Sequence, residues 1–275
     1  MAKPSGIWDV HHHWVNEVGY IDRLLKTMDR LQIERVGLIA MGDIAEDLFL
    51  IHPPREGCAG NDELAHVIKK HPDRIWGWGF IRLGRHEDRV VDRLAGAGMA
   101  GLKFHAPLKP YDDPEFFPVY DRAQQLGLPC LFHTGIFSPP KPMPGQGFRS
   151  ENCRPVYLET IAQEFPDLKM ICAHLGVCWN EEAAAICRIC TNIYADLSGR
   201  VDGWRASKSI QWYQQILYWP TAHRKVLFGS DVHADEMGEA LDDYSRIFSG
   251  LGWNEDQLRD AFCNNARRLF SGDDR

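Results

Sequence analysis

The feature that most constrains the fold is a regular alternation of β-forming runs with amphipathic stretches along the whole chain of 275 residues. Short runs rich in Val, Ile and aromatic residues predict strands, and apolar residues spaced three and four apart predict helices. Eight runs are predicted strands: 7–14, Glu34–Ala40, Arg74–Ile81, Ala100–His105, Pro129–Thr134, Leu168–His174, Ile193–Ser198 and Val226–Ser230. Strands that alternate with helices favour a parallel sheet, and eight such units are typical of a closed barrel. We therefore predict an α/β fold with one (β/α)8 barrel domain over residues 1–275.

The stretches between these runs carry helical periodicity. Predicted helices cover Tyr20–Leu31, Asp62–Lys70, Glu87–Ala97, Asp113–Leu126, Asn152–Phe165, Glu181–Cys190, Ser207–Trp219, Gly238–Phe248 and Glu255–Phe270. Pro114 lies just inside the start of one of them and Gly127 just past its end, as helix termini prefer. The rival architecture is a doubly wound open sheet, but no G-x-G-x-x-G motif follows the first predicted strand.

Composition excludes several classes of function. The net charge is −7 and no basic block occurs, which argues against nucleic-acid binding. No apolar run approaches the roughly 18 residues of a membrane span, and the first residues lack the apolar core of a signal peptide. We therefore expect a cytoplasmic protein whose eight cysteines are free thiols. Cys187 and Cys190 form a C-x-x-C pair in a predicted helix, where packing is favoured over a redox or zinc-binding role.

Polar residues follow most of the predicted strands. His11 and His13 end the first strand, and alternate residues of a strand share one face, so they and Asp9 should point the same way. The fourth, fifth, sixth and eighth strands end in Lys103 and His105, His133, His174, and Asp231. Barrels carry their chemistry at the carboxyl ends of the strands. Neutral imidazoles and a carboxylate gathered there suit one divalent ion, with zinc the first candidate and manganese or iron the alternatives.

Five motifs, taken in order, resemble the amidohydrolase superfamily, in the branch that includes aminocarboxymuconate semialdehyde decarboxylase. They are 9–13 (Asp-Val-His-His-His), 101–105 (Gly-Leu-Lys-Phe-His), 132–135 (Phe-His-Thr-Gly), 173–176 (Ala-His-Leu-Gly) and 227–231 (Leu-Phe-Gly-Ser-Asp), and residues 264–270 resemble the closing helix. By this resemblance His11, His13, His133 and Asp231 hold one metal ion. His174 acts as an acid/base group or binds a second metal ion.

The remaining site residues are assigned more loosely. His105 and Lys103 are expected to line the substrate pocket, and a carboxylated Lys103 bridging two metal ions is the alternative. Arg82 follows the third strand, where it could meet an anionic substrate or form a surface ion pair. Asp9 is interpreted as a partner that orients an imidazole of the metal site.

The resemblance leads to three functional hypotheses. The leading one is hydrolysis of an amide, lactone or ester bond in a small carboxylated molecule, with a metal-bound hydroxide as nucleophile and Asp231 as proton shuttle. The second is non-oxidative decarboxylation, as in the aminocarboxymuconate enzymes. The third is a barrel that binds a metabolite without turnover. Specificity would reside in the loops 41–60, 135–150 and 199–206, and a homodimer is expected from the branch.

Overall fold

The computed structural model describes residues 6–15, 17–42, 59–86, 89–136, 145, 147 and 149–271. Eight strands form one sheet in chain order, and all neighbouring strands in it are parallel. They are β1 (Ile7–His13), β2 (Ile33–Ile39), β3 (Ile75–Ile81), β4 (Gly101–Phe104), β5 (Cys130–Phe132), β6 (Met170–Cys172), β7 (Ile193–Asp196) and β8 (Val226–Leu227). Backbone hydrogen bonds from Val10 N to Phe228 O (2.9 Å) and from Asp231 N to His11 O (2.7 Å) join the first strand to the last. The predicted barrel is confirmed.

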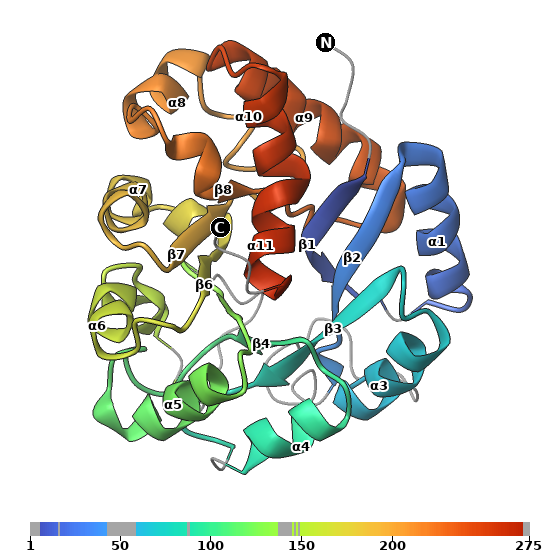
Figure 1. Ribbon diagram of the computed structural model, residues 1–275, viewed down its shortest axis with the longest axis vertical. Helices are drawn as coiled ribbons and strands as arrows, with labels where there is room; N and C mark the ends of the chain where they lie inside the picture. Colours follow the sequence, from blue (N-terminus) through green and yellow to red (C-terminus); the bar gives the residue numbers. More distant parts are fainter. Residues whose placement is uncertain are drawn as a thin grey trace.

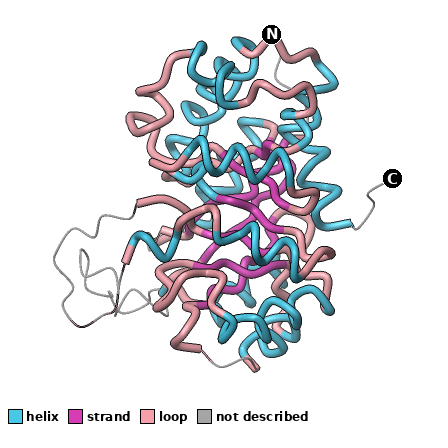
Figure 2. Tube along the Cα trace, turned by 90° about the vertical axis from the view of Figure 1, so that its left-hand side faces the viewer, coloured by secondary structure: helices cyan, strands magenta, loops and turns pink. Residues whose placement is uncertain are grey.

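Helices surround the strands on the outside (Figures 1 and 2). They are α1 (Tyr20–Leu31), α3 (Asn61–Lys70), α4 (Val90–Gly96), α5 (Phe117–Gln125), α6 (Tyr157–Glu164), α7 (Asn180–Ile189), α8 (Ile210–Ile216) and α9 (Met237–Gly250). The last predicted helix is observed as α10 (Glu255–Arg259) and α11 (Asn265–Ser271), joined by π-helical turns at Asp260–Asn264. Several helices are shorter than predicted. For example, α8 begins only after Ser209, whose hydroxyl accepts a hydrogen bond from Trp212 N.

Large apolar side chains fill the barrel interior, which is therefore a packed core. Trp78 is fully buried there, and its indole N–H donates to Val10 O at 2.8 Å. Gly101 makes room for this indole, because a Cβ at residue 101 would lie 2.4 Å from a ring carbon of Trp78. The same cluster includes Ala266 and Leu269 of α11. Figure 1 shows α11 lying across the strands at one end of the barrel, which leaves the opposite end for the polar strand ends.

Other expectations concern loops, thiols and the membrane. Most of the predicted specificity loops 41–60 and 135–150 lies outside the described residues, whereas 199–206 is described as turns and bends. Cys187 and Cys190 are buried free thiols, consistent with the packing interpretation. In the part of the chain that is described, no helix is long and apolar enough to span a membrane.

Candidate metal centre

The first strand delivers the imidazoles of His11 and His13 to one point, and a change in its pairing register separates Asp9 from them. The pairing of β1 with β2 shifts by one residue between Asp9 and His12. His11 Nε2 and His13 Nε2 then lie 3.3 Å apart, whereas Asp9 lies on the side of His12, with a carboxylate oxygen 4.0 Å from His12 Nδ1. Asp9 accepts hydrogen bonds from the backbone N–H groups of His11 and Ser230. The expectations that Asp9 shares a face with His11 and His13 and orients an imidazole are therefore wrong, because a β-bulge reverses the alternation.

Asp231 and His174 complete a cluster around these imidazoles. Asp231 Oδ1 lies 3.4 Å from His13 Nε2 and 4.0 Å from His11 Nε2. Asp231 Oδ2 lies 3.7 Å from His174 Nδ1. His11, His174 and Asp231 each offer one potential ligand atom, and these three atoms lie within 4.8 Å of one another.

These donors fit a divalent cation. Two ligands at typical zinc–nitrogen distances and a tetrahedral angle lie about 3.4 Å apart. The separations of 3.3 Å between His11 and His13 and 3.4 Å between His13 and Asp231 are close to this value. Imidazole nitrogen and carboxylate oxygen are also ligands that zinc and manganese accept.

The central strands add three more polar groups to the same place. Lys103 Nζ lies 3.2 Å from His11 Nε2. His133 Nδ1 lies 3.1 Å from His174 Nε2, and the ring of His105 stacks beside that of His133 with centroids 4.1 Å apart. Residues predicted from five strand ends thus lie next to one another, although His133 contacts the cluster through His174.

The sequence did not single out two buried residues at the end of β7, Asp196 and Ser198. Asp196 Oδ2 lies 2.9 Å from His11 Nδ1, and Asp196 Oδ1 accepts from Ser198 Oγ at 2.5 Å. Ser198 Oγ in turn lies 2.8 Å from His174 Nδ1. The signal was present, because Asp196 and Ser198 occupy the end of a predicted strand as the histidines do. Aspartate and serine there also fit an ordinary turn, so their type alone did not single them out.

Burial keeps the imidazoles neutral. It lowers the pKa of His11 and of His174 to about 4 and lowers the pKa values of His13, His105 and His133 well below 6.5. A neutral imidazole carries the lone pair that a metal ion needs. Burial also raises the pKa of Asp231, although the neighbouring His174 and Lys103 act to lower it. Burial lowers the pKa of Lys103 to about 8.

Asp196 stays ionised despite its burial. Desolvation acts to raise the pKa of its carboxyl group, but the neighbouring His11 and His174 and the hydroxyl of Ser198 lower it more. A fully buried carboxylate therefore lies directly behind His11.

The backbone is constrained where the cluster is built. Asp231 and His174 adopt left-handed conformations with φ of 48° and 59°, which are uncommon for residues other than glycine and concentrate at functional sites. Gly229 lets strand β8 approach β1 and β7 closely. A Cβ at residue 229 would lie 2.8 Å from His11 Cβ and 3.2 Å from Asp196 Cβ.

Arg82 is drawn inward and is a buried residue. Its side chain is 2% exposed, and its Nε donates to Ala106 O at 2.9 Å. The positive charge of Arg82 is also among the causes that lower the pKa of His105. Arg82 is therefore a buried cation near the histidine cluster.

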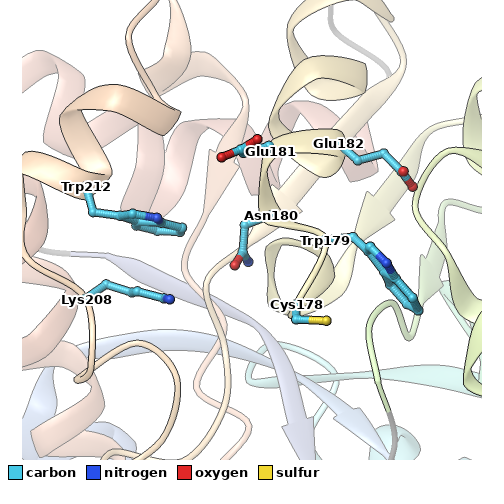
Figure 3. A pocket seen from close by; sticks show the side chains of 7 residues that line it. All are labelled: Cys178, Trp179, Asn180, Glu181, Glu182, Lys208 and Trp212. Carbon is cyan, nitrogen blue, oxygen red and sulfur yellow. The ribbon is translucent and has the colours of Figure 1, made fainter.

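A separate pocket lies between the start of α7 and helix α8. Its volume is about 470 Å³, and it is lined by Cys178, Trp179, Asn180, Glu181, Glu182, Lys208 and Trp212. In Figure 3, Trp212 and Lys208 lie on one side of Asn180 and Trp179 on the other. None of the clustered histidines lines this pocket.

The comparison with protein families decides the membership of the chain. The Amidohydrolase family model matches residues 8–272. The chain belongs to this amidohydrolase family. Its histidine cluster is thus the cluster of an amidohydrolase-family enzyme.

Individual relatives are distant. The 2-amino-3-carboxymuconate-6-semialdehyde decarboxylase of Dictyostelium discoideum is 25% identical over 130 residues, covering 42% of this amidohydrolase-family chain and only 36% of the relative. A 5-carboxyvanillate decarboxylase from Novosphingobium aromaticivorans, complexed with manganese and 4-hydroxy-3-methoxy-5-nitrobenzoic acid, shares 19% identity. The match covers 90% of this chain and 79% of the decarboxylase chain, with a TM-score of 0.62. A probable 2-pyrone-4,6-dicarboxylic acid hydrolase from Acinetobacter baumannii shares 13% identity over 97% and 99% of the two chains, also with a TM-score of 0.62. These two structures support the fold.

Proposed function

We propose that the protein is a metal-dependent lyase that removes a carboxylate group from a small carboxylated molecule. One observation carries the proposal: Lys103 is a buried cation in the centre of the cluster, 3.2 Å from His11 Nε2. Among the described residues its ammonium contacts this imidazole and no carboxylate within 4.0 Å. Arg82 adds a second buried cation nearby. A substrate carboxylate would neutralise the charge of Lys103. The names of two similar proteins, both decarboxylases, agree with such a substrate.

The chain supplies ligands, substrate contacts and a proton. His11, His13, His133 and Asp231 would hold the metal ion, which acts as a Lewis acid when bound. Lys103, Arg82 and His105 would hold and orient the anionic substrate. Loss of CO2 breaks one carbon–carbon bond and leaves its electron pair on the substrate carbon, which then takes a proton. Asp231 and His174, with 3.7 Å between Oδ2 and Nδ1, are the pair that can hold and pass this proton.

Hydrolysis is the second candidate function. It would use the same cluster, with a water molecule as the group that loses a proton. Asp231, with a pKa raised by burial, can take a proton from a water molecule and return it to a leaving oxygen or nitrogen. The likeness to a probable 2-pyrone-4,6-dicarboxylic acid hydrolase supports a carboxylated lactone as the corresponding substrate.

The two candidates differ in their products. We would strip the protein of metal, reload it with manganese or zinc, and incubate it with 5-carboxyvanillate, an aminocarboxymuconate semialdehyde and 2-pyrone-4,6-dicarboxylate. Release of CO2 in equal amount to substrate consumed supports the lyase. Incorporation of ¹⁸O from water without CO2 supports the hydrolase. The Asp231→Asn variant should be inactive in either case, and a wild type that binds metal but consumes no carboxylated compound of these classes contradicts both.

A further inference from the structure

Within the described part of the chain, three hydrogen-bond donors and one imidazole nitrogen contact the Asp196 carboxylate. Its Oδ1 accepts from the backbone N–H groups of His174 (2.8 Å) and Ser198 (3.0 Å) and from the hydroxyl of Ser198 (2.5 Å). Its Oδ2 faces His11 Nδ1 at 2.9 Å. An ionised carboxylate has no proton to give, so His11 must carry its proton on Nδ1. The lone pair of His11 is therefore on Nε2, the atom that faces His13 Nε2 at 3.3 Å.

Ser198 extends this constraint to a second imidazole. A hydroxyl has one proton, and Ser198 donates it to Asp196, so its oxygen must accept from the other neighbours. The nearest of them is His174 Nδ1 at 2.8 Å, and His11 Nδ1 lies at 3.1 Å. His174 must then also carry its proton on Nδ1, which leaves its lone pair on Nε2.

The next imidazole follows by the same logic. His174 Nε2 lies 3.1 Å from His133 Nδ1. Since His174 Nε2 is an acceptor, His133 must donate from Nδ1, and its lone pair is on Nε2. Thus one carboxylate determines the proton positions on three histidines that come from three different strands.

We propose that Asp196, directly and through Ser198, sets the tautomers of His11, His174 and His133 so that the Nε2 atoms of His11 and His133 are free to bind the metal ion. Asp196 and Ser198 are positioning residues, because they act through the imidazoles. The link to metal binding rests on the proposed function, whereas the tautomers themselves can be observed without a metal ion.

Asp196→Asn tests the proposal sharply. Three donors converge on Oδ1, so the amide oxygen should take that place and the NH2 group should face His11 Nδ1. His11 would then have to move its proton to Nε2 and lose the lone pair toward the metal. Loss of a carboxylate that supports a metal-bound histidine typically costs about 10–100-fold in metal affinity.

The experiment combines ¹⁵N NMR of the histidine rings in metal-free protein with zinc affinity measured by chelator competition. We expect Nδ1–H tautomers for His11, His174 and His133 in the wild type. In Asp196→Asn, His11 should change to Nε2–H and zinc affinity should fall about 10–100-fold. Ser198→Ala should alter the signals of His174 and His133 while His11 keeps its proton on Nδ1. The matched control is Asp260→Asn, which changes a carboxylate 3.0 Å from Nδ1 of His223, a histidine outside the cluster, and should leave zinc affinity unchanged.

An Nε2–H tautomer of His11 in the wild type, or an Asp196→Asn protein with unchanged tautomers and affinity, would overturn the proposal. If Asp196→Asn does not fold, the wild-type spectrum and Ser198→Ala decide. If the tautomers are as expected but the wild type binds no metal ion, the proposed function fails while the tautomer assignment stands.

Discussion

His11 Nε2 and His13 Nε2 lie 3.3 Å apart, on residues separated by a single position in β1. Two neutral imidazoles approach in this way either because one ring donates its N–H to the other or because a cation binds both nitrogen atoms. Burial lowers both pKa values, so each ring keeps a lone pair at pH 7 that a cation can bind. This pair of nitrogen atoms is therefore the most direct structural reason to look for a metal ion.

The first prediction concerns metal content. Elemental mass spectrometry of untagged protein should find about one divalent ion per chain. His11→Ala and Asp231→Ala should each lose most of it, since each removes a donor from the cluster. His66→Ala is the control, because His66 is an exposed residue of α3 whose Nδ1 bonds only its own helix backbone at Asp62 O. Equal metal content in all four proteins would show that the ion binds elsewhere.

The second prediction concerns the pH dependence of metal affinity. Burial lowers the pKa of Lys103 to about 8, so at pH 7 its ammonium lies beside the proposed metal position. A bound metal ion repels this charge in the substrate-free protein, so metal binding favours release of the Lys103 proton and metal affinity should rise with pH. A bound substrate carboxylate would favour the protonated form of Lys103 again. Below pH 8 the proton from Lys103 should contribute roughly tenfold per pH unit.

The Lys103→Met variant provides the comparison for this slope. It removes the cation and should bind zinc more tightly than the wild type at pH 6. The slope of log zinc affinity against pH should also be smaller in the variant, because binding releases one proton less. Chelator competition between pH 6 and 9 measures this slope. A variant with the wild-type slope would show that another group supplies the proton.

The third prediction concerns Gly229. An alanine there places a methyl group 2.8 Å from His11 Cβ and 3.2 Å from Asp196 Cβ, so His11 or strand β8 must move. We expect about 1–3 kcal/mol of lost stability from overpacking and at least a roughly tenfold loss of zinc affinity. Gly238→Ala in α9 is matched in chemistry, but its nearest neighbour is Leu31 Cδ2 at 3.6 Å. That variant should retain zinc affinity and remain as stable or become slightly more stable. Similar zinc affinity in both variants would contradict the role given to Gly229.

The barrel could be predicted from the sequence because its periodicities are local. Strands such as β3, with Ile75, Trp76, Trp78, Phe80 and Ile81, are apolar on both faces, as buried parallel strands require. The candidate residues could be found for a related reason. Parallel strands place their carboxyl ends at one edge, so residues far apart in sequence, such as His11 and His174, converge on one point.

The details that orient the site could not be predicted in this way. The bulge in β1 moves the Asp9 carboxylate away from the His11 imidazole. The sequence does not mark this bulge, because β1 and β2 are both seven residues long and the shift lies in how they pair. Asp196 has no special sequence context, and its role arises from the approach of β7 to β1 in three dimensions. The residues that hold the histidines in place come from neighbouring strands of the barrel. Sequence periodicity indicates only which face of its own strand or helix a residue occupies.

The last prediction concerns the stability that Asp9 contributes. Burial raises its pKa from 3.8 to about 7, so the folded state holds the proton more tightly than the unfolded chain does. The stabilisation is fully present below about pH 4 and is lost as the pH rises to about 7. Asp9→Asn keeps an oxygen for the N–H groups of His11 and Ser230 but carries no charge. Its free energy of unfolding relative to wild type should therefore increase by a few kcal/mol from pH 4 to pH 8, measured by urea denaturation. Asp196→Asn should change little over this range, because its neighbours lower the pKa of Asp196 and the stability that the carboxylate adds is lost only below about pH 4. Equal effects of pH on both variants would show that Asp9 is charged in the folded protein throughout this range.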